Sequence, residues 1–223
     1  MNAPIPPRKT PPAIQLLPVW RPWLRLAHLL VGLSTLLLAA TGWLVAGSPS
    51  LAEGAADLHQ LAAAALVAGL AIRLLLFFTG DLTERLDALV PKRGELRIIG
   101  ATARFYLALG RAPLPRWYAH NPLWKLPYLL LYIALAVEAA SGLLRTEHPI
   151  LWGFYLPNVH AWWFPVILWI VAGHIVAVVL HDLKGRTADV SAIIHGSRLF
   201  HVDRSALQQP VEQFVPPDLP TGC

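Results

Sequence analysis

The stretch "VHAWWFPVILWIVAGHIVAVVLHD", residues 159–182, decides the fold because it is both long and apolar. A helix of about 20 apolar residues is enough to cross a bilayer core of roughly 30 Å. This stretch nevertheless contains three imidazoles, His160, His174 and His181. An ionisable side chain inside a membrane is costly and usually has a function. The stretch therefore predicts a transmembrane helix that carries a functional site.

The composition of the whole chain agrees with a membrane protein. Of its 223 residues, 56% are hydrophobic and only 14% are charged, a balance unusual for a soluble globular protein. A net charge of +5 can indicate nucleic-acid binding. Here the basic residues lie in loops between apolar runs, so membrane orientation explains them better. We expect a lipid bilayer around the chain and no nucleic acid as a partner.

Four apolar runs are long enough to span the membrane, at about 24–46, 57–79, 124–144 and 160–181. A signal peptide is a competing interpretation of the first run, but that run is longer than the usual apolar core of such peptides. The sequence predicts an all-α integral membrane protein, a four-transmembrane-helix bundle within residues 18–200. The arm at 1–17 and the tail at 201–223 are Pro-rich and are expected to be extended or disordered.

Basic residues predict the orientation of this bundle. They are concentrated in residues 8–25, in the connector 80–123 and in residues 184–204, whereas the other two loops share only Arg145. Basic loops stay in the cytoplasm, so both termini and the connector are expected there. Within the connector, "GELRIIGATARFYLALGR" has one apolar face. It predicts either an amphipathic helix at the membrane interface or an ordinary cytoplasmic helix packed on the bundle.

Four histidines form a pattern in depth. His160 and His174 are 14 residues apart, so they share one face of a helix and lie roughly 21 Å apart along its axis. His59 opens the second run at the level of His160, and His28 lies about a turn into the first run at the level of His174. Two pairs at two depths predict two haems, each ligated by two histidines. Such a haem has no open coordination position, which favours electron transfer.

The cysteine content restricts how a cofactor can be held. Cys223 is the only cysteine, so the chain has no C-x-x-C-H site for covalent haem and no cysteine-ligated iron–sulfur cluster. Histidine or carboxylate must supply any metal ligand.

Two further residues share the histidine register. Gly42 lies 14 residues after His28, and Arg73 lies 14 residues after His59. Gly42 would leave room for the outer macrocycle, and Arg73 could pair with a propionate of the inner haem, which costs less than a lone guanidinium in lipid. A plain helix contact for Gly42 and a structural or snorkelling role for Arg73 stay open as alternatives.

Other polar residues have less specific interpretations. His181, seven residues beyond His174, is expected to contact the tail, with a role as substitute ligand kept open. Glu138 could relay protons, bind a partner group or be a hydrogen-bonded packing residue. Four histidines in loops and tails are expected to be solvated: His120, His148, His195 and His201.

With these histidines, the chain resembles the diheme cytochrome b subunits of membrane-bound nickel–iron hydrogenases and formate dehydrogenases, part of the bacterial cytochrome b561-like superfamily. The resemblance covers residues 18–200 and includes His28, His59 and the interval between His160 and His174. The stretches "RFYLALGRAP…YAHNPLWKLPY" and "DVSAIIHGSR" are most similar to the hydrogenase branch.

The resemblance implies a membrane-anchoring subunit with two b haems in the bacterial inner membrane. An iron–sulfur subunit and a catalytic subunit on the periplasmic side would deliver electrons to the His59/His160 haem. The His28/His174 haem would then pass them to quinone, which serves as electron acceptor or donor. The polypeptide alone would not act on the primary substrate.

Asn121 is the quinone contact that the resemblance implies. In "HNPLWK" it matches an Asn that contacts quinone in formate dehydrogenase relatives, although Leu123 stands here where those relatives have Gly. The alternative for Asn121 is turn chemistry, because Asn-Pro commonly begins a turn or helix.

Two other functions stay open. A free-standing quinol oxidase of the cytochrome b561 type would use the same haems without an enzyme partner. A membrane scaffold or transporter would contain no haem at all. The long connector and the "DVSAIIHGSR" segment favour the multisubunit interpretation.

Overall fold

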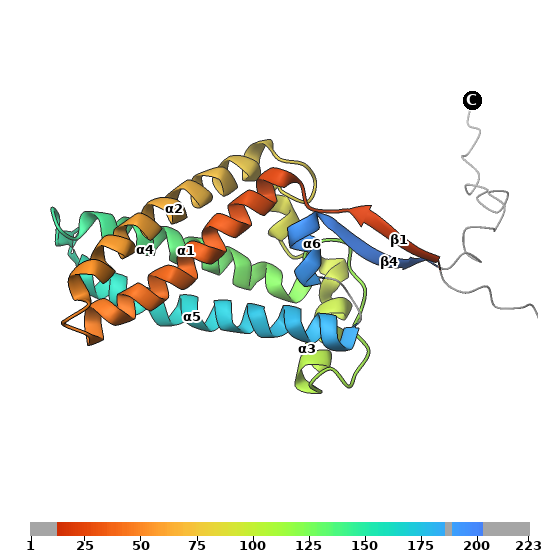
Figure 1. Ribbon diagram of the computed structural model, residues 1–223. Coiled ribbons are helices and arrows are strands. Elements are labelled where there is room, and N and C mark those ends of the chain that lie inside the picture. The colour runs from red at the N-terminus through yellow and green to blue at the C-terminus, as the bar shows by residue number, and fades with distance from the viewer. Residues whose placement is uncertain (1–12, 186–188, 203–223) are drawn as a thin grey trace, which may run out of the picture. The chain divides into compact units, whose positions relative to one another are not determined.

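The computed structural model describes residues 13–185 and 189–202 (Figure 1). The chain divides into two compact units, one covering Pro18–Arg198 and the other combining Met1–Leu17 with Leu199–Cys223. Strands β1 (Ala13–Pro18) and β4 (Ser197–Val202) pair in a two-stranded sheet. Most of the predicted arm and tail lies outside the described residues.

Four long helices make up most of the larger unit: α1 (Pro22–Gly47), α2 (Ala52–Thr79), α4 (Lys125–Leu144) and α5 (Leu156–Leu180). Each is long and apolar enough to cross a membrane. This confirms the predicted all-α membrane fold. Helices α2 and α5 begin more than one helical turn earlier than the apolar runs suggested, because Glu53 favours the first turn of α2 and Pro157 favours that of α5.

The helices pack as two hairpins. The most extensive contacts join α1 to α2 and α4 to α5, while α2 and α4 touch less. Within the first hairpin Gly69 permits close approach, since a Cβ there would lie only 2.9 Å from Cβ of Leu30. A small core cluster joins the hairpins: Leu66, Ala134, Leu135 and Ile167. This cluster lies between the two hairpins and holds them together.

The connector between α2 and α4 is a chain of short helices. These are the 3-10 turns η1 (Leu86–Leu89) and η2 (Arg93–Glu95), helix α3 (Leu96–Leu107) and the 3-10 turn η3 (Pro122–Trp124). Thr102 and Phe105 of α3 are buried, whereas Leu107 is exposed. The indole Nε1 of Trp124 donates a hydrogen bond to Tyr106 Oη at 2.9 Å. One face of α3 thus packs on neighbouring segments of the same unit.

The segment after α5 folds back onto the beginning of α1. A π-helical turn η4 (His181–Gly185) continues α5, and α6 (Asp189–His195) follows. Arg25 of α1 donates to the main-chain carbonyls of Ile193, at 3.2 Å, and Ile194. Arg198 donates to the carbonyls of Trp117 and Tyr118, each at 3.1 Å. The start of α1, the connector and α6 therefore share one end of the bundle (Figure 1).

The opposite end carries only short connections. A two-residue strand pair, β2 (Ile150–Leu151) and β3 (Phe154–Tyr155), joins α4 to α5. Trp152 and Gly153 make its turn with φ of 50° and 83°. Because the basic segments meet at the other end, they can lie on one side of a membrane. That this side is the cytoplasm stays a prediction.

A buried ion pair fixes the connector to the start of α4. Lys125 Nζ donates to both carboxylate oxygens of Glu95, at 2.7 and 2.9 Å. The main-chain N–H of Lys92 donates to Glu95 Oε2 at 3.0 Å. Burial alone would raise the pKa of Glu95, but the hydrogen bonds from Lys125 and Lys92 outweigh it and hold this pKa below its ordinary value.

Acid should weaken this attachment. Because the pKa of Glu95 is lower in the folded protein, its stabilising contribution is present above the unfolded pKa of about 4.3 and is lost as pH falls through the folded value.

At neutral pH, Glu95→Gln should destabilise the docked connector by about 1–3 kcal/mol, because Lys125 loses its charged partner. Rates of limited proteolysis in the connector measure this. The exposed Glu53→Gln is the control, and equal cleavage rates in both variants would contradict the assignment.

Candidate functional site

The structure brings together both predicted histidine pairs between the two hairpins. The ring centroids of His28 on α1 and His174 on α5 are 6.2 Å apart. Those of His59 on α2 and His160 on α5 are 6.4 Å apart. Helix α5 supplies one member of each pair, so each pair joins the first hairpin to the second.

These separations fit one metal ion between the two rings of each pair. With metal–nitrogen bonds of about 2 Å and ring centres roughly 1 Å further out, two rings on opposite sides of a metal have centres roughly 6 Å apart. In the described part of the chain, no group of three or more His, Cys, Asp or Glu residues could hold a metal ion. Two imidazoles alone are an incomplete ligand set. A porphyrin, which supplies four ring nitrogens of its own, would complete it.

Neighbouring groups hold three of the four rings through Nδ1. The contacts are Thr41 Oγ1 to His59 at 2.9 Å, the Glu138 carbonyl oxygen to His160 at 3.0 Å, and Tyr128 Oη to His174 at 3.2 Å. A hydrogen bond at one ring nitrogen orients the imidazole and leaves the other nitrogen for a metal. Each of these rings is thus positioned to coordinate through Nε2.

The proton positions at the His59/His160 pair follow from these contacts. The hydroxyl of Thr41 donates to the Leu37 carbonyl at 2.8 Å, so its oxygen is left to accept from His59 Nδ1–H. The carbonyl of Glu138 can only accept, so His160 also donates through Nδ1–H. In a neutral imidazole, this arrangement leaves the lone pair of each ring on Nε2, where a metal can bind.

The carboxylate of Glu138 lies beside the same pair. Its Oε1 is 3.6 Å from His160 Nδ1, and its buried Oε2 has no hydrogen-bond partner among the described residues. The structure thus places Glu138 next to the outer histidines. Its three interpretations stay predictions.

An apolar layer separates the two pairs. Leu66 lies seven residues after His59, and Ile167 lies midway between His160 and His174. Both belong to the buried core cluster that joins the hairpins. Steps of seven residues thus put three positions on one face of each helix. On α5 they are a histidine, a core residue and the second histidine, and on α2 they are a histidine, a core residue and Arg73.

A cavity of about 430 Å³ adjoins the His28/His174 pair. This volume is typical of sites for small molecules and cofactors. Much of its wall is apolar and comes from α1, α4 and α5, including Leu131, Leu135 and Val171. Its polar wall residues besides the pair include Arg73, His120, Asn121, Tyr128, His181 and Asp189. We call it the inner cavity.

Arg73 lies in the wall of the inner cavity, as its register predicted. It is buried, donates to Tyr132 Oη at 3.3 Å and to the main-chain carbonyl of Glu84, and lies over the Phe77 ring at 4.1 Å. No carboxylate pairs with it in the residues that the structure describes. A buried guanidinium without an acidic partner attracts an anionic group. This arrangement fits a haem propionate.

Glycines make room for the two outer histidines. A Cβ on Gly42 would lie 3.4 Å from Cε1 of His59, and one on Gly142 would lie 2.9 Å from Cε1 of His160. Gly42 thus packs against the histidine ring itself. Gly142 was not among the predicted site residues, although the small-residue run "AASG" at 139–142 of α4 is a usable signal of close packing.

Asn121 has local hydrogen bonds. Its Oδ1 accepts from the Leu123 N–H at 3.1 Å, which begins turn η3, and its Nδ2 donates to Tyr106 Oη at 3.0 Å. The structure therefore shows the turn chemistry of the second interpretation, with Asn121 also on the cavity wall.

His181 uses both ring nitrogens within the fold. They bond to Tyr106 Oη at 2.8 Å and to Asp189 Oδ2 at 3.1 Å. His181 thus contacts the segment after α5, as the first interpretation expected, and has no nitrogen left to act as a substitute ligand.

His120 was expected in solvent, and this expectation was wrong. It lines the inner cavity, and its ring centroid lies 5.1 Å from that of Trp20. Burial, with smaller contributions from Arg73 and Lys125, lowers the pKa of His120 to about 3. It is therefore a neutral hydrogen-bonding group in the wall. His148 and His195 are exposed, as expected, and the side chain of His201 lies outside the described part.

Comparison with known proteins decides the family. A family model described as prokaryotic cytochrome b561 matches residues 19–196. The chain belongs to the prokaryotic cytochrome b561 family. This cytochrome is similar to a "Probable Ni/Fe-hydrogenase B-type cytochrome subunit" of Azotobacter vinelandii, with 28% identity over 81% of this chain and 88% of the relative. A protein of the same description from Cupriavidus necator is 24% identical over 79% of this chain and 84% of its own length.

No solved structure matches this cytochrome. Family membership gives the protein a b-type haem and the general role of an electron carrier within a membrane. The paired neutral imidazoles and the buried guanidinium are compatible with that cofactor.

A methyl group on Gly142 should displace His160. We expect Gly142→Ala to lower the haem content of this cytochrome, because a Cβ at 2.9 Å from the ring forces the imidazole to move. Gly42→Ala should have a smaller effect, since its Cβ would lie at 3.4 Å. The haem-to-protein ratio of the purified cytochrome measures both. Gly47→Ala, whose Cβ meets nothing within 4 Å, is the control, and full haem content in Gly142→Ala would refute the packing argument.

Proposed function

We propose that this cytochrome is the membrane subunit that carries electrons between a hydrogenase-type enzyme and the quinone pool through two b haems. The observation that carries the proposal is the pairing of His28 with His174 and of His59 with His160, at 6.2 and 6.4 Å between ring centroids. The names of the two hydrogenase-subunit relatives support the choice of enzyme.

In this proposal His59 and His160 ligate an outer haem, and His28 and His174 ligate an inner haem. A haem supplies reversible one-electron exchange at iron. The polypeptide supplies fixed imidazoles, an apolar surrounding and a buried cation at Arg73. Two histidines on each haem would leave no open coordination position for oxygen or substrate, which favours electron transfer over catalysis at the iron.

The enzyme partners would bind at the end of the bundle near the outer pair. That end is expected to be periplasmic, with a catalytic subunit and an iron–sulfur subunit above it. The β2–β3 turn there exposes large apolar side chains, with Trp152 90% exposed and Ile150 67% exposed. Aromatic anchors of this kind are frequent in protein interfaces. They support a docking position for the iron–sulfur subunit.

Quinone would exchange electrons at the other end, near the inner haem. The inner cavity lies at this end, with Asn121 proposed as a contact to the quinone and Tyr128 beside His174. The concentration of basic residues at this end supports a cytoplasmic location for both termini in a bacterial inner membrane.

Loss of either α5 histidine should remove one haem. We expect His160→Ala and His174→Ala each to halve the bound haem, and each to reduce a two-step redox titration to one step. Reduced-minus-oxidised spectra of the purified protein measure this, with the exposed His148→Ala as control. A full haem complement in both variants would overturn the ligand assignment.

Purification from native membranes should also yield an iron–sulfur subunit and a catalytic subunit, whereas a chain that purifies alone would favour the free-standing quinol oxidase.

Replacement of Arg73 should affect only the inner haem. Removing a buried positive charge favours the more positive oxidised iron, so Arg73→Leu should lower the inner potential by on the order of 60 mV, a tenfold change in the equilibrium constant. A spectroscopic redox titration resolves the two components. Arg104→Leu removes an exposed charge on α3 and should leave both potentials unchanged. An unchanged inner potential in Arg73→Leu would remove the propionate role.

A further inference from the structure

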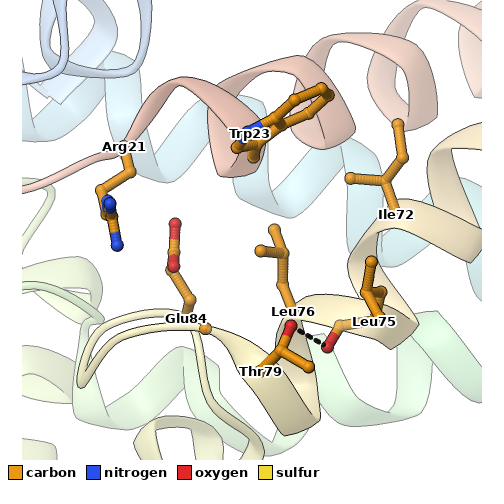
Figure 2. Close-up of a pocket in the computed structure, with 8 residues that line it drawn as sticks. Arg21, Trp23, Ile72, Leu75, Leu76, Thr79 and Glu84 are labelled. Atoms are coloured by element: carbon orange, nitrogen blue, oxygen red, sulfur yellow. Dashed lines mark hydrogen bonds between the residues drawn. The ribbon is translucent and has the colours of Figure 1, made fainter.

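A second cavity lies at the connector end of the bundle, apart from the histidine pairs. Its volume is about 350 Å³, and it lies between the beginning of α1 and the end of α2 (Figure 2). It is lined by Arg21, Trp23, Ile72, Leu75, Leu76, Thr79, Gly80 and Glu84. None of the residues predicted to bind haem or quinone lines this cavity. We call it the Glu84 cavity.

The polar group of this cavity is a buried carboxylate with an unused oxygen. Glu84 is 2% exposed, and its Oε2 accepts from the Asp81 main-chain N–H at 2.9 Å. Its Oε1 has no hydrogen-bond partner among the described residues. Figure 2 shows the carboxylate pointing away from its loop, toward Arg21 and Trp23 at the start of α1. A buried acceptor without a partner is costly and indicates a missing donor.

The backbone is shaped to hold the carboxylate in this place. A Cβ on Gly80 would lie 2.6 Å from Cβ of Glu84 and 2.9 Å from its Oε2. Only glycine permits this approach without a shift of the backbone or of Glu84. The position of Glu84 is therefore built into the end of α2.

The neighbouring polar side chains bond elsewhere. Arg21 donates to Asp81 Oδ2 at 2.6 Å, in an ion pair exposed at the surface. The Thr79 hydroxyl donates to the Leu75 carbonyl at 2.9 Å, as the dashed line in Figure 2 shows. The cavity therefore presents a strong acceptor within apolar walls. Its ligand should be an apolar molecule whose head group donates a hydrogen bond.

Two observations place this cavity between the membrane and the inner haem site. Its wall residues Trp23 and Leu75 are 63% and 60% exposed on helices long and apolar enough to cross a membrane, so a molecule dissolved in lipid can reach them. On the other side, Arg73 donates to the main-chain carbonyl of Glu84 and also lines the inner cavity. A ligand that enters from lipid would thus lie one side chain away from the inner haem site.

We propose that the Glu84 cavity binds the head group of a membrane-dissolved hydroquinone, with one hydroxyl donating to Glu84 Oε1 and the ring against the apolar walls. This inference rests on the proposed function, which makes quinone the redox partner. It adds a quinol position separate from the wall that carries Asn121. Because a quinone has no hydroxyl to donate to a carboxylate, the cavity should favour the reduced form.

A photoreactive short-chain azidohydroquinone tests the site directly. The haem-loaded cytochrome is placed under anaerobic conditions in nanodiscs of phosphatidylcholine, whose head group has no N–H donor, and the probe is added in its reduced form without any other reductant. After illumination, mass spectrometry should find the label in residues 21–23 and 72–84. Excess unlabelled quinol should suppress this labelling, and an oxidised quinone whose potential is too low to oxidise the probe should suppress it less.

Matched variants separate the cavity from its surroundings. Leu75→Trp should fill the cavity and reduce labelling about tenfold, whereas Leu74→Trp should not, because Leu74 is equally exposed at 58% but does not line the cavity. Glu84→Gln keeps the shape and removes the charged acceptor, which should weaken quinol competition about tenfold and abolish the preference for the reduced form. The haem spectrum of each variant verifies that it is folded.

Several outcomes would overturn the inference. In one such outcome, phosphatidylethanolamine added to the nanodisc suppresses the labelling and excess quinol does not. The cavity would then be a phospholipid site. Equal labelling of Leu75→Trp and the wild-type protein would also exclude binding of quinol in the Glu84 cavity. Label confined to residues 117–124, with normal reduction of the haems by quinol, would refute the Glu84 cavity and leave the proposed function intact. Label in the cavity without any reduction of the haems by quinol would instead refute the proposed function.

Discussion

The pairing of imidazoles across the two hairpins is the constraint on which the rest of this structure depends. An imidazole in an apolar helix is costly unless its nitrogens are engaged. Three of the four rings use Nδ1 for a hydrogen bond within the fold, so only a ligand at Nε2 completes them. Because α5 supplies one ring to each pair, its two histidines must stay on one face, which the interval of 14 residues provides.

The same constraint explains how the helices pack. Each hairpin is tight internally, while α2 and α4 touch less, and the core between the hairpins is a thin layer around Leu66 and Ile167. Cofactors above and below that layer would supply the missing contact surface. Haem binding would then stabilise the bundle as well as give it its chemistry, since a ligand that binds only the folded state adds its binding free energy to stability. Glycines at 42 and 142 fit this picture because they bring neighbouring helices against the ligand rings.

The sequence was sufficient for the features that repeat along a helix and insufficient for those made by loops. Hydropathy predicted four membrane helices, and register predicted that Arg73 lies beside the inner pair. The apolar runs did not predict where α2 and α5 begin, because helices extend beyond the apolar core of a membrane. His120 and Glu84 could not be placed from sequence, because both lie in connections whose path depends on tertiary contacts. The pairing of Glu84 with Gly80 becomes visible only when the chain turns back at the end of α2.

The connector end of the bundle is held by a hydrogen-bond chain whose directions are determined. Tyr106 Oη accepts from Asn121 and Trp124, so its own proton goes to His181 Nε2. Burial raises the pKa of Tyr106 to about 12, which keeps that proton in place. His181 then donates through Nδ1 to Asp189, which also pairs with Arg198 at 2.8 Å. This chain ties α3, η3 and α6 to the end of α5, so the Tyr106 proton and both ring nitrogens of His181 are already used. The Glu84 carboxylate differs from these groups, because it has one oxygen still unpaired among the described residues and can bind a new ligand without breaking a bond in the fold.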